Sequence, residues 1–362
     1  MFTYTPFGLE PQEAAPVAGY VPFGLEARSD EAAGAAAEPA DTTGAPQARP
    51  PGKSIRERLT LPADSAFAGW LGAMPDAARP YVALSRLDRP VGIWLLVLPC
   101  WIGIAFTRLA QAGLQFIDLL WAVLFLFGAV AMRGAGCTWN DITDRKIDAG
   151  VARTAGRPLP SGQVRLWQAG AWLCVQLLIG LLVWLVLPRD AKIVALLAIP
   201  LVAAYPFMKR LTWWPQAWLG ATMNWGVLVA AATVGSVSLS TLILWLGLAA
   251  WTIAYDTIYA LQDREDDALV GVKSTARLFG EHAAITAFCF HLLAAAIAAL
   301  AGWFMGADRI GALTALVFLV HGGWQYVRLR VSNEGKALEV FKSNVWAGAI
   351  LAGGFGLAAL LT

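Results

Sequence analysis

Residues 139–162 read W-N-D-I-T-D-R-K-I-D-A-G-V-A-R-T-A-G-R-P-L-P-S-G and separate two long apolar runs. Acidic and basic side chains are concentrated in this stretch, although its neighbours on both sides carry few charges. A second charged stretch, Tyr255–Asp267, ends a later apolar run and reads Y-D-T-I-Y-A-L-Q-D-R-E-D-D. Most of the remaining chain has the pattern of apolar helix, which would hold these two polar stretches together.

The composition indicates a polytopic membrane protein. The chain is 58% hydrophobic and 14% charged, and it contains 17 Trp, whereas soluble proteins carry about 25% charged residues. The four cysteines lie singly in apolar runs and form no C-x-x-C or Cys/His cluster. We therefore expect them to be small core residues without a disulfide or metal role.

The apolar runs predict an all-α fold. A spanning helix needs about 20 mainly apolar residues, and nine runs approach that length, the fourth of them containing Pro200 and Pro206. The nine candidates lie near residues 91–107, 117–138, 166–187, 191–207, 217–235, 239–257, 281–304, 309–327 and 343–361.

The distribution of Lys and Arg predicts the orientation. If the N-terminus lies inside, the inner loops hold most of the basic residues, and the outer side holds only Arg108, Arg189, Lys192 and Arg309. Because basic loops stay on the cytoplasmic side, we expect the N-terminus inside and the C-terminus outside. Both charged stretches then emerge on the same cytoplasmic face.

The N-terminal region differs from the rest of the chain. Residues 1–64 are rich in Ala, Pro, Gly and Glu, which predicts a disordered tail before a membrane-embedded domain at residues 65–362. The tail repeats Y-x-P-F-G-L-E at Tyr4–Glu10 and Tyr20–Glu26, as a duplicated linker or a docking motif. Residues 65–84 have the spacing of a short interfacial helix. The tail resembles neither a signal peptide nor a transit peptide, which favours a bacterial inner membrane.

The spacing of the acidic residues predicts a site for metal and phosphate. Asn140, Asp144 and Asp148 are separated by four residues each, so a helix would place them in one stripe about 12 Å long. Asp256, Asp263 and Asp267 are separated by seven and four residues, which again fits one helical face. Two facing acidic stripes repel each other unless cations lie between them. Mg2+ prefers carboxylates together with substrate phosphate oxygens, so the pattern favours a diphosphate–Mg2+ site.

The basic residues near these stripes fit the same chemistry. Arg145, Arg153, Arg157 and Lys273 are candidates to contact phosphate oxygens. Alternatives remain for each feature: a charged helix end is often a solvated cap, and a basic residue in an inner loop is often a topology signal. A membrane transporter would also use acidic residues, but it would place them nearer the bilayer centre. A haem protein is poorly supported because the chain has only three histidines.

Four motifs carry a resemblance to a known family. The pattern N-D-x-x-D-x-x-x-D at Asn140–Asp148, followed by R-T-x-x-R-P-L-P-S-G at Arg153–Gly162, resembles the UbiA superfamily of intramembrane aromatic prenyltransferases. The Tyr255–Asp267 stretch is similar to the second acidic region of that family. Two further motifs, Y-P-F-M-K-R at Tyr205–Arg210 and R-L-D-R-P-V-G at Arg86–Gly92, resemble its 4-hydroxybenzoate polyprenyltransferase branch.

The resemblance implies a fold, a reaction and a set of roles. The fold would have about nine transmembrane helices around a central cavity under a cytoplasmic cap. The reaction would join a polyprenyl diphosphate to 4-hydroxybenzoate at the ring carbon ortho to the hydroxyl, releasing diphosphate, in ubiquinone biosynthesis; prenylation of another aromatic acceptor is the alternative within the family. Carried over to this sequence, one Mg2+ would be bound by Asn140 and Asp144 and the other by Asp263 and Asp267. Asp141, Asp148 and Asp256 would support this site or receive a proton. Arg210 would hold the substrate carboxylate, and Tyr205 and Lys209 would line that pocket or its entrance.

Overall fold

The computed structural model describes residues 74–111, 113–149, 154–269 and 271–361, and every regular element in those residues is a helix. The predicted tail, residues 1–64, lies outside the described residues. So do residues 65–73 of the interfacial helix expected at residues 65–84. The described part of that segment contains one short helix, α3 (Arg79–Leu84), with Pro80 in its first turn, where a backbone N–H has no helical acceptor to meet.

Nine helical segments of the described chain are long and apolar enough to cross a membrane, which confirms the all-α polytopic fold. They are α4 (Val91–Arg108), α5 (Phe116–Asp148), α6 (Leu166–Val186), α7 with α8 (Arg189–Leu197 and Ile199–Leu211), α9 with α10 (Pro215–Met223 and Trp225–Val234), α11 (Leu239–Ala260), α14 (Ala283–Phe304), α15 (Asp308–Val331) and α16 (Ala337–Leu361). The short helices η1 (Leu261–Asp263), α12 (Arg264–Leu269), α13 (Thr275–Phe279) and η2 (Gly280–His282) join α11 to α14.

Two of the nine segments are broken in the middle. The fourth divides at Ala198, and Pro200 lies in the first turn of α8, where its missing N–H is tolerated. The fifth divides at Asn224, whose amide nitrogen donates to the Gly220 carbonyl at 2.8 Å and to Thr252 Oγ1 of α11 at 2.7 Å. The side chain of Asn224 therefore ties the break to a neighbouring helix inside the bundle.

The second spanning helix is longer than its apolar run. We expected a span near 117–138, but α5 continues through the charged residues to Asp148. Arg145 and Lys146 occupy its last turn, where positive charge complements the helix dipole. The candidate ligands of the first charged stretch are thus carried by a helix that projects beyond its apolar part, as their four-residue spacing predicts.

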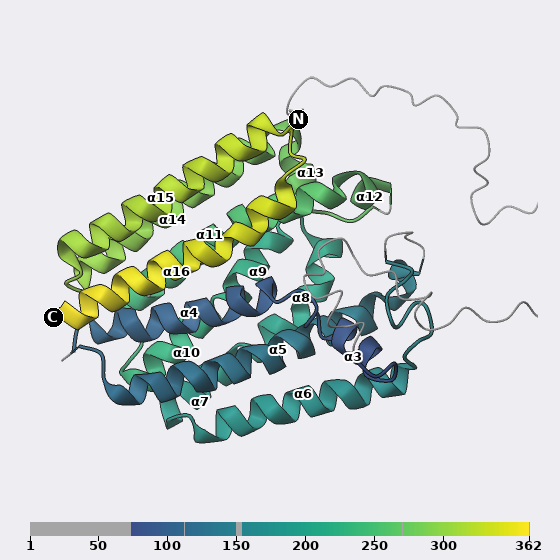
Figure 1. Ribbon diagram of the computed structural model, residues 1–362, viewed down its shortest axis with the longest axis horizontal. Helices are drawn as coiled ribbons and strands as arrows, with labels where there is room; N and C mark the ends of the chain where they lie inside the picture. Colours follow the sequence, from purple (N-terminus) through teal and green to yellow (C-terminus); the bar gives the residue numbers. More distant parts are fainter. Residues whose placement is uncertain (1–73, 112, 150–153, 270, 362) are drawn as a thin grey trace, which may run out of the picture. The chain divides into compact units, whose positions relative to one another are not determined.

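The bundle is organised around α4. This helix packs against α5, α10 and α16, and Figure 1 shows it running between α16 and α5. Its contact with α10 is close because of Gly103: a Cβ atom there would lie 2.6 Å from the Val227 carbonyl oxygen. Lipid tails are as apolar as the side chains they touch, so such close approach, together with interhelical hydrogen bonds, holds membrane helices together.

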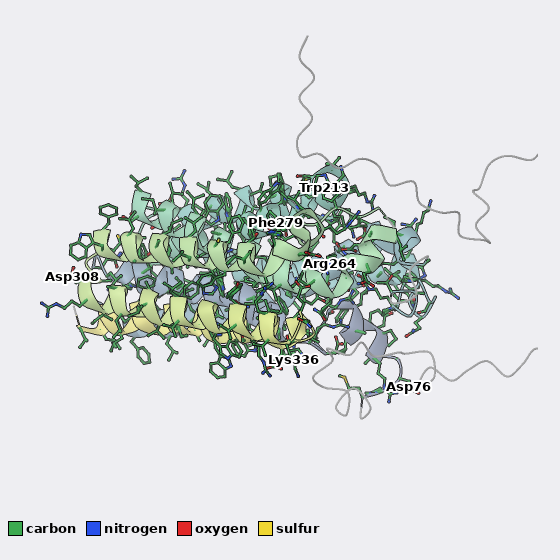
Figure 2. The ribbon with its side chains drawn as sticks, turned by 90° about the horizontal axis from the view of Figure 1, so that it is seen from above. Asp76, Trp213, Arg264, Phe279, Asp308 and Lys336 are labelled. Carbon is green, nitrogen blue, oxygen red and sulfur yellow. The ribbon has the colours of Figure 1, made fainter. Side chains whose placement is uncertain are left out.

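The two ends of the bundle have different chemistry. The short helices α3, α12 and α13 gather at one end with α8, and Figure 2 shows Arg264 and Lys336 towards that end and Asp308 at the other. At the opposite end, the turn from α4 to α5 contains a buried ion pair in which Arg108 donates to Asp118 at 2.7 and 2.9 Å. The two charged stretches emerge at the first end.

Candidate active site

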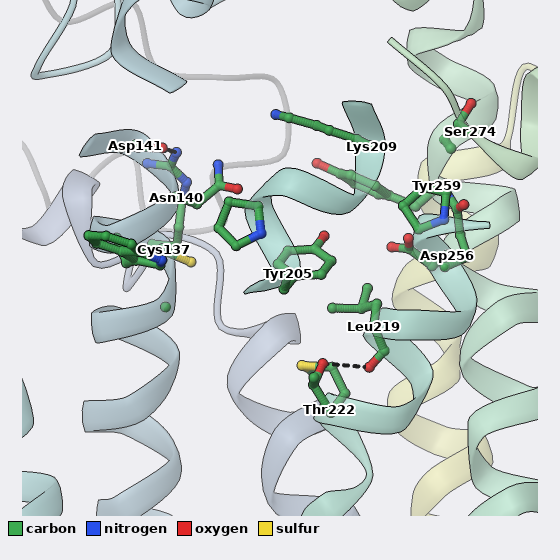
Figure 3. A pocket seen from close by; sticks show the side chains of 18 of the residues that line it. Cys137, Asn140, Asp141, Tyr205, Lys209, Leu219, Thr222, Asp256, Tyr259 and Ser274 are labelled. Atoms are coloured by element: carbon green, nitrogen blue, oxygen red, sulfur yellow. Dashed lines mark hydrogen bonds and ion pairs between the residues drawn. The ribbon is translucent and has the colours of Figure 1, made fainter. Parts of the chain in front are cut away.

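A polar cavity of about 410 Å³ lies at the end of the bundle where the short helices gather. Its walls come from α5, α8, α9, α11 and the segment that leads into α13 (Figure 3). Both charged stretches line this cavity, so the structure brings them together as the sequence predicts. Its polar lining includes Arg86, Arg133, Asn140, Asp141, Asp148, Arg157, Tyr205, Lys209, Asp256, Tyr259, Asp263, Asp267 and Lys273.

On the α5 wall, each buried carboxylate is matched by a basic residue. Arg86 donates to both oxygens of Asp141, at 2.7 and 2.9 Å, and Arg157 donates to Asp148 at 2.7 Å while lying 3.5 Å from Asp141. Burial alone would lower the pKa of the Arg86 guanidinium, but the Asp141 carboxylate opposes this strongly enough that the pKa is raised. Arg86 therefore stays charged, and the α5 wall is close to neutral.

Asp144 is also paired, but with residues of α8. Its side chain is fully buried and contacts Lys209 Nζ through one oxygen and Arg210 Nη2 through the other, the latter at 2.8 Å. Asp144, a predicted metal ligand, thus forms one ion cluster with Lys209 and Arg210, which were predicted to bind substrate. Arg210 is 41% exposed and lies outside the described cavity lining, whereas Lys209 lines the cavity.

The opposite wall carries Asp256, Asp263 and Asp267, all of which line the cavity. From their spacing we expected one continuous helical face. The structure does not place them on one. Asp256 lies in α11, Asp263 ends the 3-10 turn η1, and Asp267 lies in α12. The change of helix type turns the chain at the end of α11, and the second stretch curves around the cavity.

Three hydrogen bonds connect the elements around this wall: two join the segment before α13 to the end of α8, and one joins α13 to α12. The Lys273 backbone N–H donates to the Lys209 carbonyl at 3.0 Å, and Lys273 Nζ donates to the Leu211 carbonyl at 3.3 Å. The Arg277 guanidinium donates to the Asp267 carbonyl at 3.2 Å and lies over the Trp213 ring. Since Lys209 also contacts α5, the end of α8 connects the two acidic walls.

The centre of the cavity is lined by polar side chains from three helices. In Figure 3, Asn140 and Asp256 lie on opposite sides, and Tyr205 lies between them below Lys209. The amide and carboxylate oxygens here are hard donors, and basic side chains stand beside them. This arrangement can bind a polyanion between the two walls and hold a polar molecule next to Tyr205.

Arg133 is a cavity residue that the motif analysis missed. It lies on α5 within the apolar run, lines the cavity, and its buried Nε has no hydrogen-bond partner among the residues that the structure describes. A charged residue inside a spanning helix is costly and usually functional, so its position in the run at 117–138 was a usable signal. Arg133 supplies a cation on the membrane side of Asn140.

Asp144, fully buried in its ion cluster, is also absent from the described lining of the cavity, and two other predicted residues lie elsewhere. Arg145 is exposed and donates to the Ile142 carbonyl of its own helix at 3.2 Å, so the structure does not bring it into the described lining of the cavity. Arg153 lies outside the described residues.

An apolar groove of about 770 Å³ continues from the polar cavity towards the far end of the bundle. It runs along α5, α6, α7 with α8, and α10, and nearly all of its lining is aliphatic or aromatic. The polar cavity and this groove share six residues: Leu96, Met132, Gly136, Trp139, Val202 and Thr222. One molecule with a charged head and a long apolar tail would fill both spaces.

The sequence matches a known family over most of the bundle. Residues 96–352 match the model of the UbiA prenyltransferase family. The chain belongs to this family. The resemblance inferred from the four motifs is thereby confirmed.

Relatives of this UbiA chain include two eukaryotic proteins. It is 43% identical over 295 residues to the mitochondrial 4-hydroxybenzoate polyprenyltransferase of Drosophila melanogaster, covering 80% of this chain and 74% of the relative. It is 40% identical over 292 residues to the protein of the same name from Arabidopsis thaliana, covering 79% and 70%. A UbiA homolog from Archaeoglobus fulgidus, solved with GPP and Mg2+, has the same fold: the TM-score is 0.59 at 16% identity, covering 78% of this chain and 100% of that one.

Proposed function

We propose that this protein transfers a polyprenyl group from a polyprenyl diphosphate to 4-hydroxybenzoate, at the ring carbon ortho to the hydroxyl, in ubiquinone biosynthesis. The observation that carries the proposal is the identity of 40% or more to relatives named for this reaction, over more than two thirds of each chain. The joined polar cavity and apolar groove support it independently, because a polyprenyl diphosphate has a charged head and a long apolar tail.

The donor set fits Mg2+. Among the described residues no three carboxylate, His or Cys side chains converge on one point, so the protein alone would not complete a metal site. Mg2+ is commonly held by one or two carboxylates, with the other positions filled by water and phosphate oxygens, and the two walls offer such partial sets. Asn140 with Asp144 would hold one ion, and Asp263 with Asp267 the other. When bound, Mg2+ would neutralise the charge that develops on the leaving diphosphate.

The basic side chains of the cavity would bind the diphosphate. Arg157, Lys209 and Lys273 line the space between the walls, and Arg145 and Arg153 are further candidates from the sequence alone. Lys209 would leave Asp144 to contact phosphate. Its positive charge would then neutralise the substrate instead of a carboxylate of the protein. Fixed cations of this kind stabilise the negative charge of the leaving group as the allylic C–O bond breaks.

The acceptor would lie beside Tyr205 on the membrane side of the diphosphate. Arg133 is placed to bind its carboxylate, because its buried guanidinium lines the cavity and its Nε has no hydrogen-bond partner among the described residues. Arg210, predicted for this role from the family motif, would serve it only after leaving Asp144. A ring carbon then attacks the allylic carbon, diphosphate leaves, and the displaced ring proton passes to Asp256, which restores aromaticity. The apolar groove keeps water away from the allylic carbon.

The protein would work in a bacterial inner membrane, with its N-terminus and the cavity on the cytoplasmic side. The basic residues of the loops around the cavity support this orientation. The two relatives are named as mitochondrial, and the corresponding side there would be the matrix.

The direct test is an assay of purified membranes containing this chain, with 4-hydroxybenzoate, Mg2+ and polyprenyl diphosphates of several lengths. The expected product is the 3-polyprenyl acid, identified by mass spectrometry. Membranes containing the Asp263→Ala variant are the control. Prenylation of a different aromatic acid in preference to 4-hydroxybenzoate, or no prenylation at all, would contradict the proposal.

A further inference from the structure

Gly136 stands where the polar cavity meets the apolar groove. It lies in α5, one turn before Asn140, and it is among the six residues that line both spaces. The other five have side chains that enclose the junction. Gly136 has no side chain, so it leaves space at its position in the junction.

The packing of the protein does not explain this glycine. Glycine inside a helix is less favourable than alanine because its backbone loses more freedom on folding, so a helical glycine usually permits a close contact. Gly134, on the same helix, does so: a Cβ atom there would lie 2.5 Å from Gln176 Nε2. At Gly136 a Cβ atom would meet nothing within 4 Å. The empty space beside Gly136 is therefore room for something other than a neighbouring side chain.

The direction of the groove indicates what that is. Its α5 wall is formed by positions three or four residues apart, from Phe125 through Gly128, Met132 and Gly136 to Trp139. This face extends about 21 Å along the helix at 1.5 Å per residue. A linear apolar chain that leaves the polar cavity would cross the α5 surface at Gly136 to enter the apolar groove.

We propose that Gly136 is a specificity-determining residue for the prenyl donor, and that its missing side chain forms the passage for the first isoprene units. This inference rests on the proposed function, since it takes the donor's apolar tail as the occupant of the groove. It explains why glycine is used at a helical position where alanine would fit the protein equally well.

The test is a series of side chains at this position, Gly136→Ala, Gly136→Val and Gly136→Leu, with matched substitutions at Gly170. Gly170 is also helical, a Cβ there also meets nothing within 4 Å, and it lines neither cavity among the described residues. Each added methyl at Gly136 should lower kcat/KM for a long donor about 10- to 200-fold. The inhibition constant for inorganic diphosphate, which has no tail, should stay within about twofold. The thermal midpoint should match that of the Gly170 series.

Two results would overturn the inference. One is transfer of long donors by Gly136→Leu at the rate of Gly170→Leu. The other is weaker inhibition by diphosphate in parallel with the loss of transfer, since that would mean that the ionic cavity itself had changed. If the unsubstituted protein transfers no donor of any length to 4-hydroxybenzoate, the proposed function fails instead. The two failures are therefore distinguishable.

Discussion

Removing one partner of the Arg86–Asp141 ion pair should destabilise the protein strongly, and Arg86→Met tests this. Asp141 is 1% exposed and Arg86 is 11% exposed, and two hydrogen bonds of 2.7 and 2.9 Å join them. Methionine keeps an unbranched apolar stem and removes the charged guanidinium. The variant leaves a buried carboxylate whose remaining basic neighbour among the described residues is Arg157 at 3.5 Å, and Arg157 is already paired with Asp148.

The expected magnitude follows from this geometry. Removing one partner of a buried pair costs about 3–5 kcal/mol because the other charge is left unpaired. Arg157 offers partial compensation, so we expect about 3 kcal/mol, which is about a 150-fold change in the unfolding equilibrium. Replacing both partners, in Arg86→Met with Asp141→Leu, removes the unpaired charge and should return the free energy of unfolding to within about 1 kcal/mol of the unsubstituted protein.

The measurement is SDS-titrated unfolding in mixed micelles, followed by tryptophan fluorescence. Arg145→Met is the control, because an exposed residue of this kind should change stability by no more than about 0.5 kcal/mol. The pKa of Arg86 is raised, so its contribution is complete below the ordinary arginine pKa and the effect should not change between about pH 7 and pH 10. The reasoning is refuted if Arg86→Met is no less stable than Arg145→Met, or if the double variant is as unstable as the single one.

Further predictions separate chemistry from stability. Asp144→Ala and Asp263→Ala should each lower kcat by at least about 100-fold without preventing membrane insertion; near-normal rates would contradict the metal assignment. Arg133→Met should raise the KM for 4-hydroxybenzoate by about 10- to 150-fold, which corresponds to a charged hydrogen bond of about 1.5–3 kcal/mol. A larger rise of this KM in Arg210→Ala would assign the carboxylate contact to Arg210 instead. Chelation of divalent cations should stop product formation and added Mg2+ should restore it. Arg108→Met, at the far end of the bundle, should lower the thermal midpoint and leave both KM values of the folded fraction unchanged.

The sequence was sufficient for the fold because the membrane imposes one simple rule. A spanning segment must satisfy its own backbone hydrogen bonds, so each apolar run of adequate length becomes a helix. The nine runs were therefore readable one by one. The breaks at Ala198 and Asn224 were less readable, because a break depends on a partner from another helix: Asn224 donates to Thr252, which is distant in the sequence.

The acidic residues of the site could be predicted from the sequence, whereas the basic residues that pair with them could not. Regular spacing identified Asp144 and Asp148, since a helix converts spacing into a shared face. Spacing carries no information about α8, so the contact of Lys209 with Asp144 could not be foreseen. The turn at η1 was also hidden, because residues of a 3-10 turn and of an α-helix have similar composition. Arg133 could have been recognised as a charged residue inside an apolar run, but it belongs to none of the four motifs.

The pairing of the α5 carboxylates sets an order of assembly during synthesis. Arg86 is made 55 residues before Asp141, so that pair can form as soon as α5 is complete. Lys209 follows Asp144 by 65 residues, which at about 5–20 residues per second is a delay of about 3–13 s. During that interval neither Lys209 nor Arg210 has been made, so Asp144 has no partner from α8. The nascent chain thus completes one wall of its cavity before the opposing cations of α8 exist.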